Sequence, residues 1–255
     1  MNAPASHPLT VRDRAEMSPE YFETLSRMLR SQAYRELAAA VVFAEAIALV
    51  PTLEFKRHVV HTIEEEMEHY ATCVTLAEAL GIEGFDEACS HHVRVERPIP
   101  RIESFLEMGV AACLYDSASA YQLREYENSS FDPYCRVIGR ILEEEEGHEN
   151  FGAELMIRLS REPQNKEELQ RCFDKWLAVS LRSFGRPGPE RSRYAIEAGL
   201  KTRDSAAVAQ DYIDSLKSTM RVCGVDLPTR ERLRELGTET AADIDLDVCP
   251  AYQWK

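Results

Sequence analysis

Residues 62–70 read TIEEEMEHY and residues 141–150 read ILEEEEGHEN, and these two stretches decide the fold. Each contains a glutamate followed three residues later by a histidine: Glu66 with His69, and Glu145 with His148. Residues three apart are neighbours on one face of an α-helix, here a face that is otherwise apolar. Burying a carboxylate there is costly unless a partner such as a metal ion compensates its charge. We therefore interpret each pair as part of a metal site inside a helical bundle.

Four long stretches with helical periodicity carry these motifs, and we predict helices over 32–50, 53–80, 102–128 and 133–160. Short links join the first to the second and the third to the fourth, so each pair should form an antiparallel hairpin. Residues 81–100 (GIEGFDEACSHHVRVERPIP) separate the hairpins and are rich in loop-forming residues. A connection of this length is typical of a crossover between hairpins. The predicted fold is all-α, a ferritin-like four-helix bundle with additional C-terminal helices.

A complete di-iron site in such a bundle also needs one carboxylate from each of the other two helices. Glu36 and Asp116 lie on the apolar faces of the first and third predicted helices. Glu36 precedes Glu66 by 30 residues and Asp116 precedes Glu145 by 29, so the two hairpins look like a weak internal duplication. The predicted metal ligands are Glu36, Glu66, His69, Asp116, Glu145 and His148.

Other carboxylates compete for these roles. Glu45 could replace Glu36, but it lies only 21 residues before Glu66 and breaks the match between the hairpins. Glu65 and Glu144 could each form an i, i+4 pair with the histidine of their own helix. We instead predict that they act across the bundle, Glu65 on His148 and Glu144 on His69, because a metal-bound imidazole usually donates its other N–H to a carboxylate.

Small and aromatic side chains near the predicted ligands would leave space for an organic molecule. From helical spacing alone, the residues expected to line this substrate pocket are Ala40, Phe43, Ala112, Tyr115, Ser119, Ala120 and Leu123. The metal ligands aside, no residue is assigned a catalytic role.

Composition limits the class of protein. The formal net charge of −14 disfavours nucleic-acid and anionic-membrane partners. No apolar run approaches the roughly 18 residues of a membrane span, and the N-terminus lacks a signal-peptide core, so we expect a cytoplasmic protein. The seven cysteines are scattered singly, without the paired spacing of a zinc or iron–sulfur site, and should be free thiols.

The chain is predicted to divide into four parts: a flexible leader at 1–17, the bundle at 18–161, a helical lobe packed on the bundle at 162–238, and a tail at 239–255. Trp176 is the expected anchor between the lobe and the bundle. Tyr252 and Trp254 are candidate docking residues in the tail.

Between about residues 32 and 192 the sequence resembles the phenylacetic acid catabolic protein family. The resemblance is carried by Glu36 and by VPTLEFKRHVVHTIEEEMEH (50–69), YDSASAYQ (115–122), DPYCRVIGRILEEEEGHENFG (132–152) and WLAVSLRSFGRPGPERS (176–192). Aspartate at the third-helix ligand position, here Asp116, is a feature of catalytic subunits in that family. The chain is shorter than those subunits, and no acyl-CoA-binding residues can be matched.

The resemblance implies a di-iron monooxygenase that activates dioxygen to epoxidise, hydroxylate or N-oxygenate a small aromatic or acyl-linked substrate. Its cofactor would be two Fe ions, although a carboxylate-rich site also accepts manganese. With no nucleotide-binding glycine loop or cluster cysteines, the electrons would come from a separate reductase. A companion subunit or a homo-oligomer is a further expected partner. The alternative is a ferritin-like iron-binding protein or a non-catalytic partner subunit of a multicomponent oxygenase.

Overall fold

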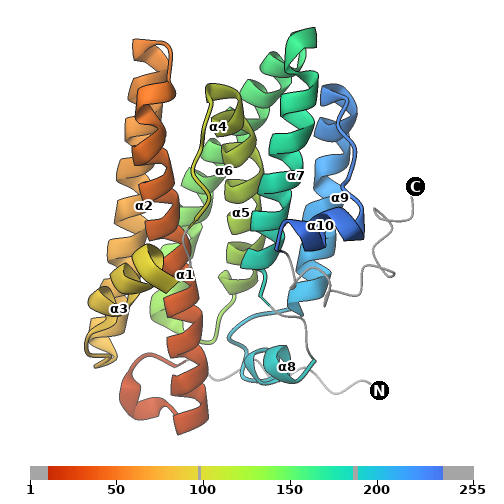
Figure 1. The fold of residues 1–255 in the computed structure, drawn as a ribbon. Coiled ribbons are helices and arrows are strands. Elements are labelled where there is room, and N and C mark those ends of the chain that lie inside the picture. The colour runs from red at the N-terminus through yellow and green to blue at the C-terminus, as the bar shows by residue number, and fades with distance from the viewer. Residues whose placement is uncertain (1–10, 97–98, 186–188, 238–255) are drawn as a thin grey trace.

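The computed structural model describes residues 11–96, 99–185 and 189–237. Within these residues the chain is helical and has no β-strand, which confirms the predicted all-α class. The α-helices are α1 (Pro19–Ala46), α2 (Leu53–Ala79), α3 (Phe85–His91), α4 (Phe105–Ala111), α5 (Ser117–Leu123), α6 (Asp132–Ser160), α7 (Lys166–Ser183), α8 (Pro189–Glu197), α9 (Ser205–Cys223) and α10 (Arg230–Glu235). Helices α1 and α2 form one hairpin, and the α4–α5 segment with α6 forms the second (Figure 1).

Helix α1 begins well before the predicted start at residue 32. The Ser18 hydroxyl caps it by accepting a hydrogen bond from the Tyr21 backbone N–H at 3.1 Å, and Pro19 occupies the first turn. Leu25 and Leu29, within the added turns, are fully buried. The predicted start was therefore wrong, because the polar residues between these leucines hide the apolar face of the first turns.

The third predicted helix is not a continuous α-helix. Between α4 and α5, residues Ala112–Asp116 form a π-helical segment. Helix α6 passes very close to this segment, since a Cβ atom on Gly152 would lie 2.2 Å from the backbone nitrogen of Cys113. A contact this close requires glycine on α6. The π-helical segment ends at Asp116, one of the predicted ligands, and π turns of this kind are frequent at functional sites.

Replacing Gly152 by alanine is expected to destabilise the protein by about 3 kcal/mol, the upper end of the usual cost of overpacking. The added methyl group would collide with backbone atoms of Ala112 and Cys113, which cannot rotate away. Chemical denaturation of the Gly152→Ala variant measures this loss.

Gly139 provides the matched control on the same helix. It is exposed, and nothing lies within 4 Å of a Cβ added there. The Gly139→Ala variant should therefore be unchanged or more stable by up to about 1 kcal/mol, through helix propensity. Equal stability of the two variants would contradict the close helix contact.

The connection between the hairpins contains a helix where a loop was predicted. Helix α3 buries Phe85 and Cys89 and packs on α1 and α2, and a π-helical segment, His92–Glu96, follows it. The glycine, proline and acidic residues of this stretch obscure the short apolar face that these two side chains provide.

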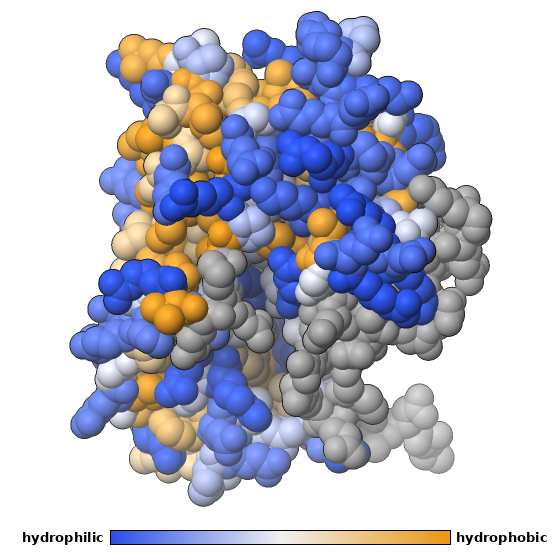
Figure 2. Space-filling model, in the orientation of Figure 1, coloured by the Kyte–Doolittle hydropathy of each residue, from blue (hydrophilic) through white to orange (hydrophobic). Residues whose placement is uncertain are grey.

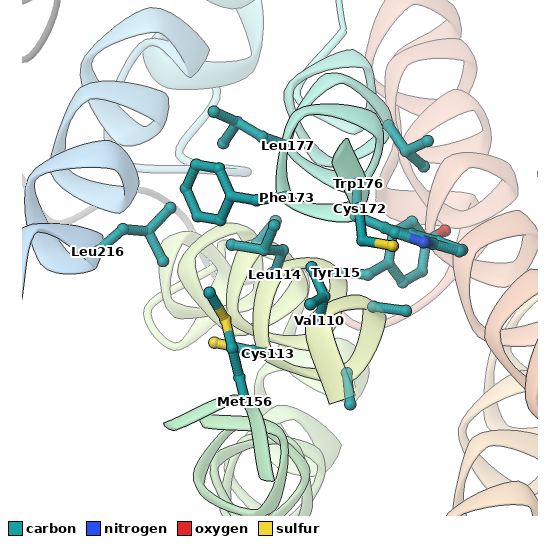
Figure 3. Close-up of a cluster of buried hydrophobic side chains, with 14 of the residues drawn as sticks. Val110, Cys113, Leu114, Tyr115, Met156, Cys172, Phe173, Trp176, Leu177 and Leu216 are labelled. Carbon is teal, nitrogen blue, oxygen red and sulfur yellow. The ribbon is translucent and has the colours of Figure 1, made fainter. Parts of the chain in front are cut away.

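The C-terminal helices extend the bundle on one side. Helix α7 packs on α4 and α5, and α9 packs on α5 and α6. Figure 3 shows the shared core, where Phe173 and Leu177 from α7 and Leu216 from α9 lie close to Leu114. Trp176 is 1% exposed and donates a hydrogen bond from Nε1 to the buried Glu107 carboxylate at 3.0 Å. It therefore anchors α7 on the bundle.

The division into leader, bundle, lobe and tail stays a prediction. Residues 11–17 fall in the predicted leader, yet Val11 exchanges backbone hydrogen bonds with Ser130 and Asp132 at 2.7 and 2.9 Å, and Val11 and Met17 are buried. The predicted tail, with Tyr252 and Trp254, lies outside the described residues.

Apolar side chains are unevenly distributed on the surface. Figure 2 shows them gathered along the side formed by α1 and α2, whereas the surface over α7 and α10 is mostly hydrophilic. On α2, Leu53, Val60 and Met67 follow one another at seven-residue intervals and are 66%, 55% and 43% exposed. Among the described helices, none is long and apolar enough to cross a bilayer.

Candidate metal centre

All four long segments of the bundle contribute a predicted ligand to its interior. Glu36 comes from α1, Glu66 and His69 from α2, Asp116 from the end of the π-helical segment, and Glu145 and His148 from α6. Every one of these six side chains is at most 3% exposed. Four ionisable carboxyl groups in a bundle core are unusual, because such groups are almost never fully buried without partners.

The six side chains converge. Ligand atoms of Glu36, Glu66, His69 and Glu145 all lie within 4.8 Å of one another. Nδ1 of His69 is 3.6 Å from Glu36 Oε2 and 3.9 Å from Glu145 Oε1, and Nδ1 of His148 is 3.3 Å from Glu66 Oε1. Asp116 and His148 border the same small cavity. The residues selected by sequence spacing thus meet in one place.

Within the part of the chain that the structure describes, the atoms that would bind metal lack hydrogen-bond partners. They are both carboxylate oxygens of Glu66, both of Asp116, Oε2 of Glu145, and Nδ1 of His69 and of His148. Buried polar groups are rarely left unsatisfied in this way. A set of carboxylate oxygens and imidazole nitrogens suits iron and related divalent ions. The residues present therefore fit a metal centre with two ions.

Without metal, the electrostatics of this site favour protonated carboxyl groups. Burial, together with the neighbouring Glu145 and Glu36, raises the pKa of Glu66 well above its ordinary value. Burial and the same two neighbours raise the pKa of Asp116. The pKa of Glu145 rises to about 8, chiefly through burial and then through Glu36. Metal ions would supply the positive charge that protons otherwise provide.

The two histidines respond differently to their surroundings. Burial acts to lower the pKa of His69, but hydrogen bonding to Glu36 and the charges of Glu36 and Glu145 outweigh it and raise the pKa to about 9. Burial lowers the pKa of His148 despite its bond to Glu65. A metal ligand must present a neutral imidazole nitrogen, so metal binding at His69 must release a proton.

Each histidine also contacts a carboxylate of the opposite hairpin. Nε2 of His69 is 2.7 Å from Glu144 Oε2, and Nε2 of His148 is 2.8 Å from Glu65 Oε2. These bonds fix the rings so that Nδ1 faces the other ligands. Arg140 holds Glu144 in place at 2.9 Å. The cross-bundle pairs expected from the sequence are present, and their effect on metal binding stays a prediction.

Replacing Glu144 by glutamine is expected to weaken iron affinity by about 10- to 100-fold, the usual effect of losing a carboxylate behind a metal-bound histidine. The amide keeps the size of the side chain but loses the charge that orients His69. Competition with a coloured chelator measures the affinity. Glu143→Gln, an exposed neighbour on α6, should bind iron like the wild type. A similar loss in both variants would contradict this role of Glu144.

The predicted substrate pocket is only partly reproduced. The small cavity beside Asp116 and His148 is also lined by Phe43, Val59, Thr62, Met108, Ala112 and Phe151. Of the seven predicted lining residues, Phe43 and Ala112 border it, and Ala40, Tyr115, Ser119, Ala120 and Leu123 do not.

Those five residues have other surroundings. Tyr115 packs edge-on against Trp176 (Figure 3). Ala120 and Leu123 belong to a separate apolar cluster, and Ala40 is buried. The Ser119 hydroxyl donates to Glu145 Oε1 at 3.2 Å, so it holds a predicted ligand.

The structure separates Glu36 from its competitor. Glu45 is 52% exposed at its side chain and pairs with Arg101 at 3.4 Å, unlike the buried Glu36. Gln32 was not predicted from the sequence, yet its buried amide donates to Glu36 Oε1 and accepts from Arg35. The spacing of Gln32 and Glu36, one helical turn apart, is the signal that could have revealed this contact.

Comparisons with known proteins agree with this geometry. A family model described as phenylacetic acid catabolic protein matches residues 1–242. The first subunit, by letter, of the 1,2-phenylacetyl-CoA epoxidase of Escherichia coli (strain K12) is 22% identical over 221 residues, which are 83% of this chain and 71% of that protein. The range matched by the family model contains all six side chains of the candidate metal centre.

Proposed function

The chain belongs to the phenylacetic acid catabolic protein family, and from this premise we propose that it is a di-iron monooxygenase. The observation that carries the proposal is the set of buried, unpartnered ligand atoms on Glu66, Asp116, Glu145, His69 and His148. A site of this kind costs folding free energy unless ions occupy it. Glu36 would complete the ligand set, one carboxylate from each of α1 and the π-helical segment, and a Glu-x-x-His pair from each of α2 and α6.

When bound, two ferrous ions would supply the activation of dioxygen. The overall reaction inserts one oxygen atom into the substrate and releases the other as water, and it consumes two electrons and two protons. The protein surrounds the reacting position with apolar side chains, which exclude bulk water. Phe43 and Met108 line the cavity beside Asp116, and Thr62 contributes the hydroxyl among the lining residues.

The proposed substrate is a small aromatic or acyl-linked molecule. The Escherichia coli relative is named for phenylacetyl-CoA, an aromatic acyl thioester. The aromatic and aliphatic lining of the cavity, with Phe43, Val59 and Phe151, suits an apolar ring better than a polar molecule. We propose epoxidation of an aromatic acyl group as the leading reaction, with hydroxylation and N-oxygenation as the related outcomes of the same oxygen insertion.

The proposed electron donor is a separate reductase. The cysteines among the described residues are free thiols, and burial raises the pKa of Cys73 and of Cys113, so they offer no redox centre. The relative is one subunit of its enzyme, and we propose that this chain likewise binds a companion subunit. The exposed Leu53, Val60 and Met67 of α2 supply an apolar surface suited to such a contact.

The test is dioxygen consumption by the iron-loaded, chemically reduced protein. We expect consumption to rise when phenylacetyl-CoA or a related aromatic acyl thioester is added, with an oxygenated product detected by mass spectrometry. Oxidation of iron with mineral build-up and no organic product would instead identify an iron-handling protein. A Glu145→Gln variant, which loses one ligand carboxylate, is the control for reaction outside the metal centre.

A further inference from the structure

A second pocket lies outside the metal centre, beside α8 and at the end of the bundle opposite the turn between α1 and α2 (Figure 1). Its volume is about 490 Å³, within the range of small-molecule sites. Residues from α1, the end of α5, the end of α7, α8 and the start of α9 line it, so it joins the bundle to the C-terminal helices. The lining contains three basic residues, Arg27, Arg35 and Lys201, and one acidic residue, Glu125.

Arg35 is buried without a salt bridge to any described residue. It is 4% exposed, and its guanidinium donates to Gln122 Oε1 at 2.7 Å and to Gln32, both neutral amides. Its Nε has no hydrogen-bond partner among those residues. The next residue, Glu36, faces His69 in the metal centre. A buried guanidinium is normally paired with an anion, because its desolvation is otherwise uncompensated.

Lys201 is the second cation without a carboxylate partner. Its ammonium donates to the hydroxyls of Ser192 and Ser205 at 3.1 and 3.0 Å, and no carboxylate among the described residues lies within salt-bridge distance. The acidic lining residue is already compensated, because Glu125 accepts from the Arg203 guanidinium at 2.9 Å. The pocket therefore carries an excess of positive charge on a chain whose formal net charge is −14.

The arrangement of donors indicates which anion fits. The guanidinium of Arg35 presents a planar fork, and Lys201 and its two serines add an ammonium and hydroxyl groups on the same pocket. Phosphate accepts many hydrogen bonds at once, and arginine, lysine and serine are its usual partners. The pocket is much larger than one phosphate ion, so there is space for an organic group attached to it.

We propose that this pocket is a binding site for a phosphate-bearing ligand, held by Arg35 and Lys201. The negative charge of the phosphate would complete the two cations that the fold leaves without carboxylate partners. This site is independent of the proposed oxygenase chemistry, since none of its donors is a predicted metal ligand.

Calorimetric titration of the full-length, metal-free chain tests the proposal, with inorganic phosphate and ADP as separate probes. We expect saturable 1:1 binding that weakens as ionic strength rises. Tighter binding of ADP than of inorganic phosphate would assign the site to an organic phosphate, and equal binding would assign it to the free anion. Lys201→Met should weaken binding about 10- to 100-fold, the effect of losing one charge-assisted hydrogen bond.

Lys166→Met, which removes an exposed charge at the start of α7, is the matched control and should bind like the wild type. If Lys201→Met fails to fold by circular dichroism, Ser205→Ala replaces it and should give a smaller loss. Absence of saturable binding for both probes would overturn the proposal. So would wild-type affinity in a folded Lys201→Met or Ser205→Ala variant, or equal losses in the control.

Discussion

Glu66→Ala is expected to reduce the iron content of the purified, reconstituted protein from two ions per chain to one or none. Glu66 lies at the centre of the site, within 4.8 Å of the ligand atoms of Glu36, His69 and Glu145 and 3.3 Å from His148 Nδ1. Both of its oxygens lack hydrogen-bond partners among the described residues, so metal binding is the role that accounts for them. Colorimetric iron analysis after reconstitution and desalting gives the number directly.

A second variant at this position should behave in the opposite way without metal. Removing a buried carboxyl group relieves the repulsion among the ligand carboxylates, so metal-free Glu66→Gln, which preserves the side-chain volume, should melt above the metal-free wild type near neutral pH. This distinguishes loss of a ligand from general damage to the fold. Glu64→Ala, exposed on the same helix, is the control and should keep two iron ions. Two iron ions in both Glu66 variants would show that the ligand assignment is wrong.

The metal-free protein is expected to lose stability as pH rises. The folded-state pKa of Glu145 is about 8, against 4.5 for an ordinary glutamate, and the pKa of His69 is about 9, against 6.5. Folding therefore takes up protons between these values, and the stability present at pH 4.5 is lost as pH rises through 8 or 9. For Glu145 alone the difference corresponds to on the order of 5 kcal/mol. At this chain length, that loss lowers the Tm by about 10 °C or more.

Iron should reverse this trend, because ions replace the protons. Under anaerobic conditions, the Tm gain on adding ferrous iron should be larger at pH 8 than at pH 6, measured by circular dichroism in matched buffers. Glu145→Gln removes one titrating group, so the pH dependence of its metal-free Tm should be shallower. A metal-free Tm that stays constant or increases between pH 5 and pH 9 would contradict the burial of these carboxyl groups without compensation.

Sequence spacing located the ligand set because an α-helix has a fixed period. Glu66 and His69 are three residues apart, and any continuous helix puts such residues on one face. The match between the two hairpins selected Glu36 over Glu45, and the structure buries the first and exposes the second. Cross-bundle contacts such as Glu144 with His69 followed from the usual chemistry of metal-bound imidazole.

The substrate pocket could not be predicted in the same way. The seven lining residues were chosen on an ideal helix, but Ala112–Asp116 is π-helical. A π turn changes the direction of side chains relative to a continuous α-helix, and Tyr115, inside that turn, packs against Trp176 instead of facing the cavity. Val59 and Phe151, which do line the cavity, have no local pattern that distinguishes them from ordinary core residues.

The second pocket was also beyond the reach of sequence analysis. Arg35 and Lys201 are 166 positions apart, and isolated basic residues have no periodicity that predicts a shared site. Only the packing of the C-terminal helices on the bundle brings them to one cavity. The segment around Lys201 lies between α8 and α9, where no repeated motif marks its function.

Anomalous diffraction from crystals of the iron-loaded protein tests the central claim most directly. We predict two iron peaks inside the bundle, each in contact with one histidine and with carboxylates, and together contacting Glu36, Glu66, His69, Asp116, Glu145 and His148. Absence of iron peaks within this cluster, or peaks held only by other residues, would contradict the proposed metal centre.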